Sequence, residues 1–251
     1  MKKRPKRRIV LLIVLIAAAT AALLAVYVQA KQKKILLNEW FVNEKNRVVG
    51  VDVSYYQADI DMAVLKAQGV GFIYIKATEG SSRQDERFAW NWKNAREAGL
   101  PSGAYHFFSF DSAGSTQAEN FIRTVGPDLK GRLIPVVDVE YYGDKEKNPP
   151  EKADVVRELK FWLDAVEKQY GVKPMIYTRP DVCKKYLGDE FDEYKKWLSS
   201  VYMPLSWKYH GDWVLWQYLN RGELEGYSGD EKYIDLNVLN RKNSIEDLLV
   251  D

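Results

Sequence analysis

The chain has 251 residues and a mass of 29.0 kDa, which is long enough for one large domain with a buried core. Hydrophobic residues make up 46% of it and charged residues 29%, a composition that excludes a disordered protein. The single cysteine, Cys183, excludes an intramolecular disulfide framework and a multi-cysteine zinc site. Aromatic residues, at 13%, suit a protein that binds flat ring faces such as those of sugars.

The net charge of +2 conceals an uneven distribution of charge along the chain. The first 34 residues carry nine Lys or Arg and no acid, which leaves 28 of the 37 basic residues against all 35 acidic ones. The larger part of the chain is therefore acidic. Because binding to phosphates needs a basic surface, we expect no nucleic-acid partner.

The N-terminus has the pattern of a membrane segment. A basic tail, residues 1–8, precedes 22 residues without charge at 9–30, which as a helix would span roughly 30 Å. Six basic residues before the run and three after it predict a single-pass transmembrane helix with the N-terminus inside and the folded domain outside the cytoplasm. The alternative is a signal peptide cleaved after Ala30, which would give a secreted protein. Residues 31–47 are then a juxtamembrane stalk.

From residue 48 onward, short apolar runs alternate with amphipathic stretches. The apolar runs occupy residues 48–53, 71–77, 101–108, 133–140 and 174–178, followed by 213–218 and 232–237. The amphipathic stretches predict helices near 61–69, 85–98, 113–125 and 151–170. This order predicts an α/β fold, an irregular TIM-like β/α barrel of five βα units followed by three mainly β strands. The barrel covers 48–240, with 241–251 as a C-terminal tail, and a doubly wound sheet is the alternative.

Acidic side chains follow several of these strands. Asp138 and Glu140 stand two positions apart at the end of one strand, so their side chains share a face and their Cα atoms lie roughly 6.5 Å apart. Two buried carboxylates at that spacing repel each other, which raises the pKa of at least one. A carboxylic acid that stays protonated near neutral pH can protonate a leaving glycosidic oxygen. Asp52 and Asp235, at the ends of other strands, would join them because the active site of a barrel lies at the carboxyl ends of its strands.

Seven motifs in order resemble one family. They are Val51–Gln57 (VDVSYYQ), Ile75–Gly80 (IKATEG), Gly99–Phe107 (GLPSGAYHF), Val137–Glu140 (VDVE), Ile176–Thr178 (IYT), Leu215–Tyr218 (LWQY) and Ile234–Asn237 (IDLN). This series is similar to glycoside hydrolase family 25, the N-acetylmuramidases or lysozymes of that type. The resemblance covers about residues 48–240 and departs at the sixth strand, which we assign to Val201–Trp207.

The resemblance implies a barrel that cleaves the β-1,4 bond between N-acetylmuramic acid and N-acetylglucosamine in peptidoglycan. It implies Glu140 as the general acid, Asp138 as the second carboxylate, and Asp52 and Asp235 as further residues of the catalytic cleft. The candidate substrate-binding residues are Tyr56, Gln57, Glu79, Tyr105, Tyr177, Trp216, Gln217 and Asn237. The expected partners are peptidoglycan glycan strands and, through the N-terminal helix, the membrane; no metal or cofactor is expected.

The residues leave two questions open. Asp138 could orient the acetamido group of the substrate as an internal nucleophile, the version we favour, or act as a direct nucleophile or as a base for water. The alternative functions are a cell-wall glycan-binding module without turnover, and a hydrolase of another N-acetylhexosamine polymer such as chitin. The departure at the sixth strand motivates the second of these alternatives.

Overall fold

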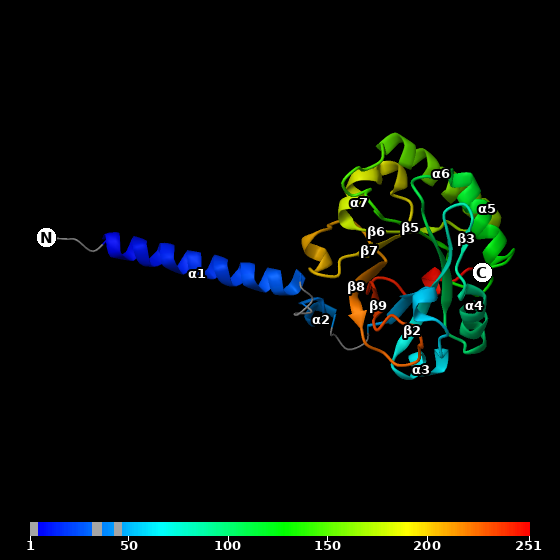
Figure 1. Cartoon of the computed structure of the whole chain (residues 1–251), viewed down its shortest axis with the longest axis horizontal. Helices are drawn as coiled ribbons and strands as arrows, with labels where there is room; N and C mark the ends of the chain where they lie inside the picture. Colours follow the sequence, from blue (N-terminus) through cyan, green and yellow to red (C-terminus); the bar gives the residue numbers. More distant parts are fainter. Residues whose placement is uncertain (1–4, 32–36, 43–46) are drawn as a thin grey trace.

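The N-terminal apolar run forms one long helix, α1 (Pro5–Lys31), which projects away from the remainder of the chain (Figure 1). The computed structural model describes residues 5–31, 37–42 and 47–251. Within α1, the segment Ile9–Gln29 has a mean hydropathy of 3.1 and none of it is buried, so it is long and apolar enough to cross a membrane. A signal sequence would have the same features. Residues 1–4 of the predicted tail, and 32–36 and 43–46 of the predicted stalk, lie outside the described residues.

Eight strands close into a barrel. Neighbouring strands follow the order β1-β9-β8-β7-β6-β5-β4-β2, and pairing between β1 and β2 closes the circle. The barrel strands are β1 (Val49–Val53), β2 (Val70–Glu79), β4 (Ser102–Phe107), β5 (Val136–Val139), β6 (Met175–Thr178), β7 (Lys196–Ser199), β8 (Leu215–Gly222) and β9 (Ile234–Leu239). All neighbouring pairs are parallel except those of β9, which runs antiparallel to both β8 and β1. The short strand β3 (Arg83–Gln84) pairs with the end of β2 outside the circle.

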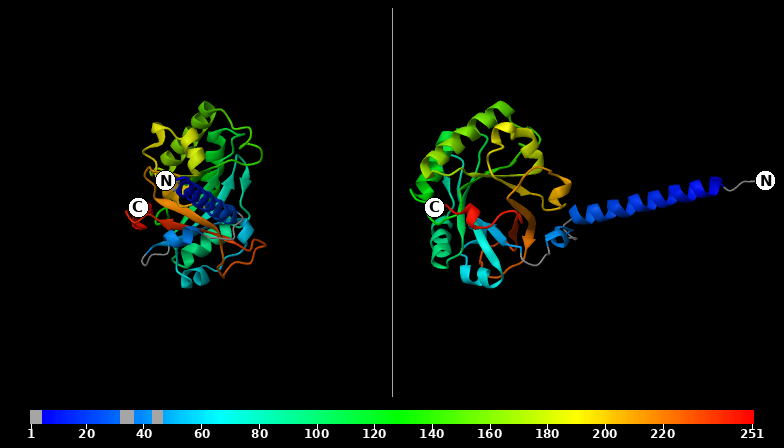
Figure 2. Two further views of the ribbon diagram at one scale, coloured as in Figure 1. Left: turned by 90° about the vertical axis from the view of Figure 1, so that its left-hand side faces the viewer. Right: turned by 180° about the vertical axis from the view of Figure 1, so that it is seen from behind.

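Helices follow the first five parallel strands, as the sequence predicts. They are α3 (Met62–Ala67), α4 (Phe88–Glu97), α5 (Gly114–Val125), α6 (Lys152–Tyr170) and α7 (Pro180–Tyr186). Short 3-10 turns stand elsewhere: η1 (Tyr55–Gln57), η2 (Asp189–Phe191), η3 (Leu205–Trp207) and η4 (Glu246–Leu248). Helices α4, α5 and α6 lie on the side of the barrel away from α1, while α2 (Leu37–Val42) lies on the side from which α1 projects (Figures 1 and 2). The predicted five βα units and three mainly β strands are confirmed.

The assignment of the sixth strand was wrong. The strand is β7, Lys196–Ser199, whereas the predicted segment Val201–Trp207 forms a loop that ends in η3. The apolar residues of that loop resemble a strand, but Pro204 lacks the N–H that a central strand needs. A strand of only four residues, such as β7, is too short to show a clear hydrophobic pattern in the sequence. It forms because β6 and β8 hydrogen-bond to it on either side.

Side chains on the barrel strands alternate between the interior and the layer beneath the helices. On β2, Phe72 and Tyr74 belong to the interior cluster, whereas Ile73 and Ile75 pack against helical residues. Gly50 and Gly103 lie against those two rings, and a Cβ at either glycine would overlap the ring. The apolar interior therefore fills the barrel as far as the level at which the polar strand ends begin.

The last residues of the chain pack at the amino-terminal ends of the strands. Leu248 in η4 is fully buried in the interior cluster, and its carbonyl accepts a hydrogen bond from the Ile134 N–H at 2.8 Å. Leu249 forms an isolated β-bridge with Leu133, the residue that precedes Ile134. Residues in the predicted tail thus cover one end of the barrel, opposite the end where the polar strand ends meet.

Candidate active site

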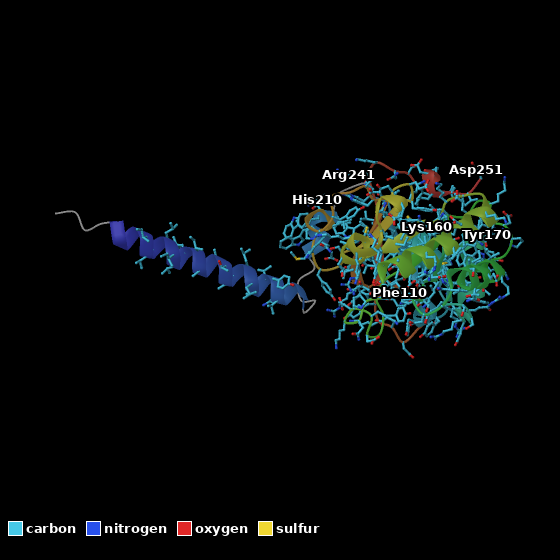
Figure 3. The ribbon with its side chains drawn as sticks, turned by 90° about the horizontal axis from the view of Figure 1, so that it is seen from above. Phe110, Lys160, Tyr170, His210, Arg241 and Asp251 are labelled. Atoms are coloured by element: carbon cyan, nitrogen blue, oxygen red, sulfur yellow. The ribbon has the colours of Figure 1, made fainter. Side chains whose placement is uncertain are left out.

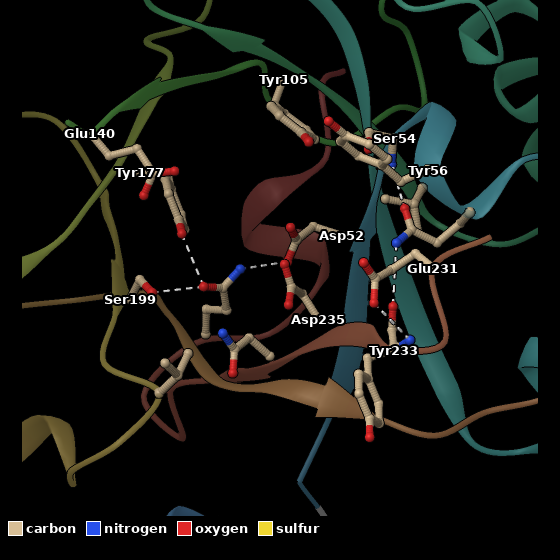
Figure 4. Close-up of a pocket in the computed structure, with 15 residues that line it drawn as sticks. Asp52, Ser54, Tyr56, Tyr105, Glu140, Tyr177, Ser199, Glu231, Tyr233 and Asp235 are labelled. Carbon is tan, nitrogen blue, oxygen red and sulfur yellow. Dashed lines mark hydrogen bonds between the residues drawn. The ribbon is translucent and has the colours of Figure 1, made fainter. Parts of the chain in front are cut away.

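A cleft opens at the carboxyl ends of the barrel strands (Figure 4). Its cavity measures about 420 Å³, and a deeper space of about 220 Å³ adjoins it. Eight of the predicted residues line the outer cavity, namely Asp52, Tyr56, Gln57, Tyr105, Glu140, Tyr177, Gln217 and Asp235. Asp138 lines the deeper space together with Glu140. The structure therefore brings the four predicted carboxylates into one cleft. Asp52 lies on β1, Asp138 on β5 with Glu140 directly after it, and Asp235 on β9.

Strand alternation explains why Asp138 and Glu140 both face the cleft. Val137 and Val139 pack in the layer beneath the helices, so the residues between and after them point into the barrel. Asp138 is buried, and its Oδ1 has no hydrogen-bond partner among the described residues. Burial raises the pKa of Asp138 well above its usual value, and the neighbouring Glu140 adds to the rise.

Glu140 is the carboxyl group with a pKa suited to proton donation near neutral pH. Burial raises its pKa to about 7, with an opposing effect from the Arg179 guanidinium and a further rise from Asp52. Lys76, whose Nζ lies 4.9 Å from the centroid of the Phe107 ring, lines the same space and lowers the pKa of both carboxyls. Glu140 can therefore hold a proton near neutral pH while its carboxyl group remains accessible from the cleft.

Asp52 accepts two hydrogen bonds that define its orientation. Its Oδ2 accepts from Asn237 Nδ2 at 2.7 Å and from Gln217 Nε2 at 3.1 Å. Gln217 Oε1 in turn accepts from the hydroxyls of Tyr177 at 3.0 Å and Ser199 at 2.7 Å (Figure 4). These hydrogen bonds determine the orientation of the Gln217 side-chain amide, whose oxygen faces the two hydroxyls and whose N–H faces Asp52. Burial raises the pKa of Asp52, and the two amide donors offset part of that rise.

Three predicted substrate-binding residues do not line the cleft. Glu79 instead pairs with Lys76 at 2.8 Å and with Arg83 at 3.2 Å. Asn237 is fully buried beneath Asp52, and its Oδ1 accepts from Trp197 Nε1 at 2.8 Å. Trp216 points out of the barrel, because Gln217, the next residue on β8, points in. The indole of Trp216 donates to the Ser200 carbonyl at 3.2 Å instead.

The structure adds residues that the sequence reasoning missed. They are Phe107, Trp197, Ser199, Val201, Asn220, Glu231 and Tyr233, which line the cleft together with the strand-end residues Ser54 and Lys76. Phe107 faces the same side of its strand as Tyr105, so counting every second residue along that strand would have found it. Trp197 and Ser199 were missed with the sixth strand itself. Glu231 and Tyr233 come from the loop before β9 and carry no local signal.

Comparisons with known proteins agree with this geometry. The sequence model described as glycosyl hydrolases family 25 matches residues 51–227. Among curated proteins, YegX of Escherichia coli K12 is 35% identical over 204 residues, which cover 79% of this chain and 71% of YegX. Lysozyme M1 of Streptomyces globisporus is 31% identical over 208 residues, covering 77% of this chain and 68% of the relative.

A solved structure supports the same assignment. The family 25 glycosyl hydrolase from Bacillus anthracis is 46% identical, with a TM-score of 0.71, over 80% of this chain and 93% of that protein. The match to the family model covers more than half of the present chain. The barrel, its cleft of carboxylates and these similarities lead to one conclusion: the chain belongs to glycosyl hydrolases family 25.

Proposed function

We propose that this chain is a membrane-anchored muramidase, which hydrolyses the β-1,4 bond between N-acetylmuramic acid and N-acetylglucosamine in peptidoglycan. The observation that carries the proposal is the pair Asp138 and Glu140, two carboxyls with raised pKa side by side in the cleft of a family 25 barrel. Relatives named as a lysozyme and as N,O-diacetylmuramidases support the choice of substrate. Four carboxyl groups in one cleft disfavour a binding module without turnover, because burying them costs stability.

Glu140 serves as the general acid. With a pKa of about 7, it holds a proton at neutral pH while it lines the open cavity. That proton passes to the bridging oxygen, which leaves with the N-acetylglucosamine unit as a free hydroxyl. The bond between this oxygen and C1 of the muramic acid unit breaks in the same step.

Asp138 orients the acetamido group of the muramic acid unit. Its Oδ1, which has no hydrogen-bond partner in the described part of the chain, accepts the acetamido N–H, and this bond favours the ionised form of Asp138 once substrate is bound. The acetamido carbonyl oxygen then forms a bond to C1 as the leaving oxygen departs, giving a positively charged oxazolinium ring beside the Asp138 carboxylate. Water next attacks C1, the ring opens, and the proton of the water returns to the Glu140 carboxylate.

Asp52 and Asp235 complete the negative wall of the cleft. They sit opposite each other on the paired strands β1 and β9, and both line the cavity that holds Glu140. Their charge stabilises the positive charge that develops at the sugar ring in the transition state. The hydrogen bonds from Asn237 and Gln217 keep Asp52 in position for this role.

Helix α1 anchors the enzyme in a membrane, with its N-terminus inside and the barrel outside the cytoplasm. Its apolar segment of 21 residues and the six basic residues before it support this topology. An acidic barrel gains no long-range attraction to an anionic polymer, so a tether that raises the local concentration of enzyme near the wall compensates.

Digestion of purified peptidoglycan tests the activity. The full chain in detergent should release fragments that end, after borohydride reduction, in reduced muramic acid, as read by mass spectrometry. Glu140→Gln should release these ends at least about 100-fold more slowly. Reduced glucosamine ends, turnover of chitin oligomers alone, or the absence of any new ends would each overturn the proposal. The anomer released from a soluble glycan tests the acetamido step, since an inverted product would exclude it.

A further inference from the structure

Two short segments expose large aromatic side chains on the side of the barrel that faces α1. Trp40 and Phe41 of α2 are 77% and 44% exposed, and Trp207 of η3 is 58% exposed. The rings of Phe41 and Trp207 meet edge to face, with centroids 6.1 Å apart. We call these three side chains the aromatic face. Figure 3 shows His210, three residues after Trp207, at the end of the barrel nearest α1, with Asp251 at the other end.

Buried contacts hold α2 against the barrel. Asn38, only 1% exposed, donates through Nδ2 to the carbonyls of Ser200 at 2.7 Å and Tyr218 at 2.9 Å. Val42 is 5% exposed within the apolar cluster of Leu198, Leu205 and other residues. One side of α2 therefore packs on the barrel while Trp40 and Phe41 point outward, and exposed clusters of large apolar side chains mark interaction surfaces.

Covalent geometry places the aromatic face close to the end of α1. Helix α1 ends at Lys31 and α2 begins at Leu37, so six peptide steps of at most ~3.6 Å separate them, about 20 Å in all. Tyr27 of α1 lines a groove together with Tyr202 and Lys208, and Lys208 is the neighbour of Trp207. If α1 crosses a membrane, the aromatic face cannot lie far from its surface.

The chemistry of this region matches the headgroup layer of a bilayer. Tryptophan is enriched at membrane interfaces, where one part of the indole is apolar and the N–H is hydrated. Lys31, Lys33 and Lys34 follow the apolar segment in the sequence, and Lys208 lies beside Trp207. Cations at this position attract anionic lipid headgroups.

We propose that Trp40, Phe41 and Trp207 insert into the headgroup region of the outer leaflet and hold the barrel against the membrane that α1 crosses. The inference rests on the anchor proposed above. Ser199, Val201 and Asn220 line both the catalytic cleft and the groove that contains Tyr27. Docking by the aromatic face therefore holds the rim of the cleft beside the membrane, where it reaches the glycan strands nearest the bilayer.

Quenching of tryptophan fluorescence by brominated lipids tests this docking. The full chain is placed singly in nanodiscs of phosphatidylcholine and phosphatidylglycerol, with or without bromine on the acyl chains close to the headgroup. All eight tryptophans lie at position 40 or later, so α1 contributes no signal. We expect brominated lipid to quench the wild-type chain, and the double variant W40F/W207F to lose most of that quenching.

A matched variant controls for the loss of a tryptophan. Trp90 is 53% exposed on α4, on the side of the barrel away from α1, so W90F should be quenched as strongly as the wild type. Equal quenching of W40F/W207F and the wild type, or no quenching of either, would overturn the docking. If the aromatic face instead binds a second copy of the chain, discs that hold several chains should give crosslinked dimers, while discs that hold one chain should show no quenching. That result would also contradict docking on the membrane.

Flotation of the full chain with vesicles after a high-salt wash tests the anchor separately. A chain that floats but is not quenched contradicts only the aromatic face, whereas a chain that does not float removes the anchor and the docking together. Replacing Trp40 and Trp207 should leave turnover of a soluble glycan unchanged, because neither side chain lines the cleft.

Discussion

Asp138 and Glu140 show how burial prepares a carboxyl group for proton transfer. Each would lose its proton near pH 4 in water, but the barrel removes solvent from both and places them near each other. The fold therefore carries an electrostatic cost at this point.

The rate should follow the protonation of Glu140. Because only the protonated acid donates, kcat/KM on a soluble glycan should fall as pH rises through about 7, the pKa of this group. Glu140→Gln should lower kcat by about 10²–10⁴-fold and remove this limb of the profile. Glu97→Gln, on the exposed surface of α4, is the control and should change neither. A profile that stays flat up to pH 9 in the wild type would contradict the assignment.

Stability should change with pH in the direction set by the same group. The pKa of Glu140 is higher folded, about 7, than the unfolded value of 4.5, so its favourable contribution is complete below pH 4.5 and lost as pH rises through 7. The loss amounts to about 3 kcal/mol. Urea unfolding at pH 5 and pH 8 should show a smaller decrease for Glu140→Gln than for the wild type. Equal decreases in the two proteins would exclude this linkage.

At the scale of elements, β8 shows why neighbouring residues of one motif can have different roles. Trp216 and Gln217 were both predicted to shape the sugar site, yet adjacent residues on a strand face opposite sides. Gln217 connects Tyr177, Ser199 and Asp52 inside the cleft, while Trp216 packs outside the barrel. The motif therefore located the strand in the sequence. Only the alternation of side chains along that strand decides which residue faces the cleft and which packs outside the barrel.

Substitutions on β8 should reveal this division. Gln217→Leu removes a donor to Asp52 and the shared acceptor of two hydroxyls, so kcat/KM should fall by about 10–100-fold, the equivalent of ~1.5–3 kcal/mol. Trp216→Phe should keep kcat/KM close to the wild-type value, although it loses the bond to Ser200 and some stability. Steady-state kinetics on a soluble glycan would measure both. A comparable loss in Trp216→Phe would show that its ring acts in the cleft after all.

On the scale of the whole molecule, the chain ends take part in the architecture. Residues 37–42 pack on β8 as α2, and Leu248 fills the opposite end of the barrel. Segments predicted as a stalk and a tail thus contribute buried contacts, although each lies far in sequence from the strands it touches. The barrel needs such closure, since its interior cluster would otherwise be open to water at the end away from the cleft.

Truncating the side chain that closes this end should destabilise the whole barrel. Leu248→Ala leaves a cavity where a fully buried side chain stood, and should lower the free energy of unfolding by about 2–5 kcal/mol. Glu246→Ala, exposed in the same turn, should change it by less than about 0.5 kcal/mol. Urea denaturation followed by circular dichroism would measure both. If the two variants were equally stable, the C-terminal segment would not belong to the cooperative core.

The sequence by itself determined the membrane-type apolar segment, the order of strands and helices, and the acidic residues at the strand ends. Each of these is encoded locally, by hydropathy, periodicity and residue type within one short stretch. Only the tertiary structure decided the position of the sixth strand, the place of Glu231 and Tyr233 along the cleft, and the packing of α2. Short strands and loops take their places through hydrogen bonds and contacts with partners distant in sequence, and those partners meet only when the barrel closes.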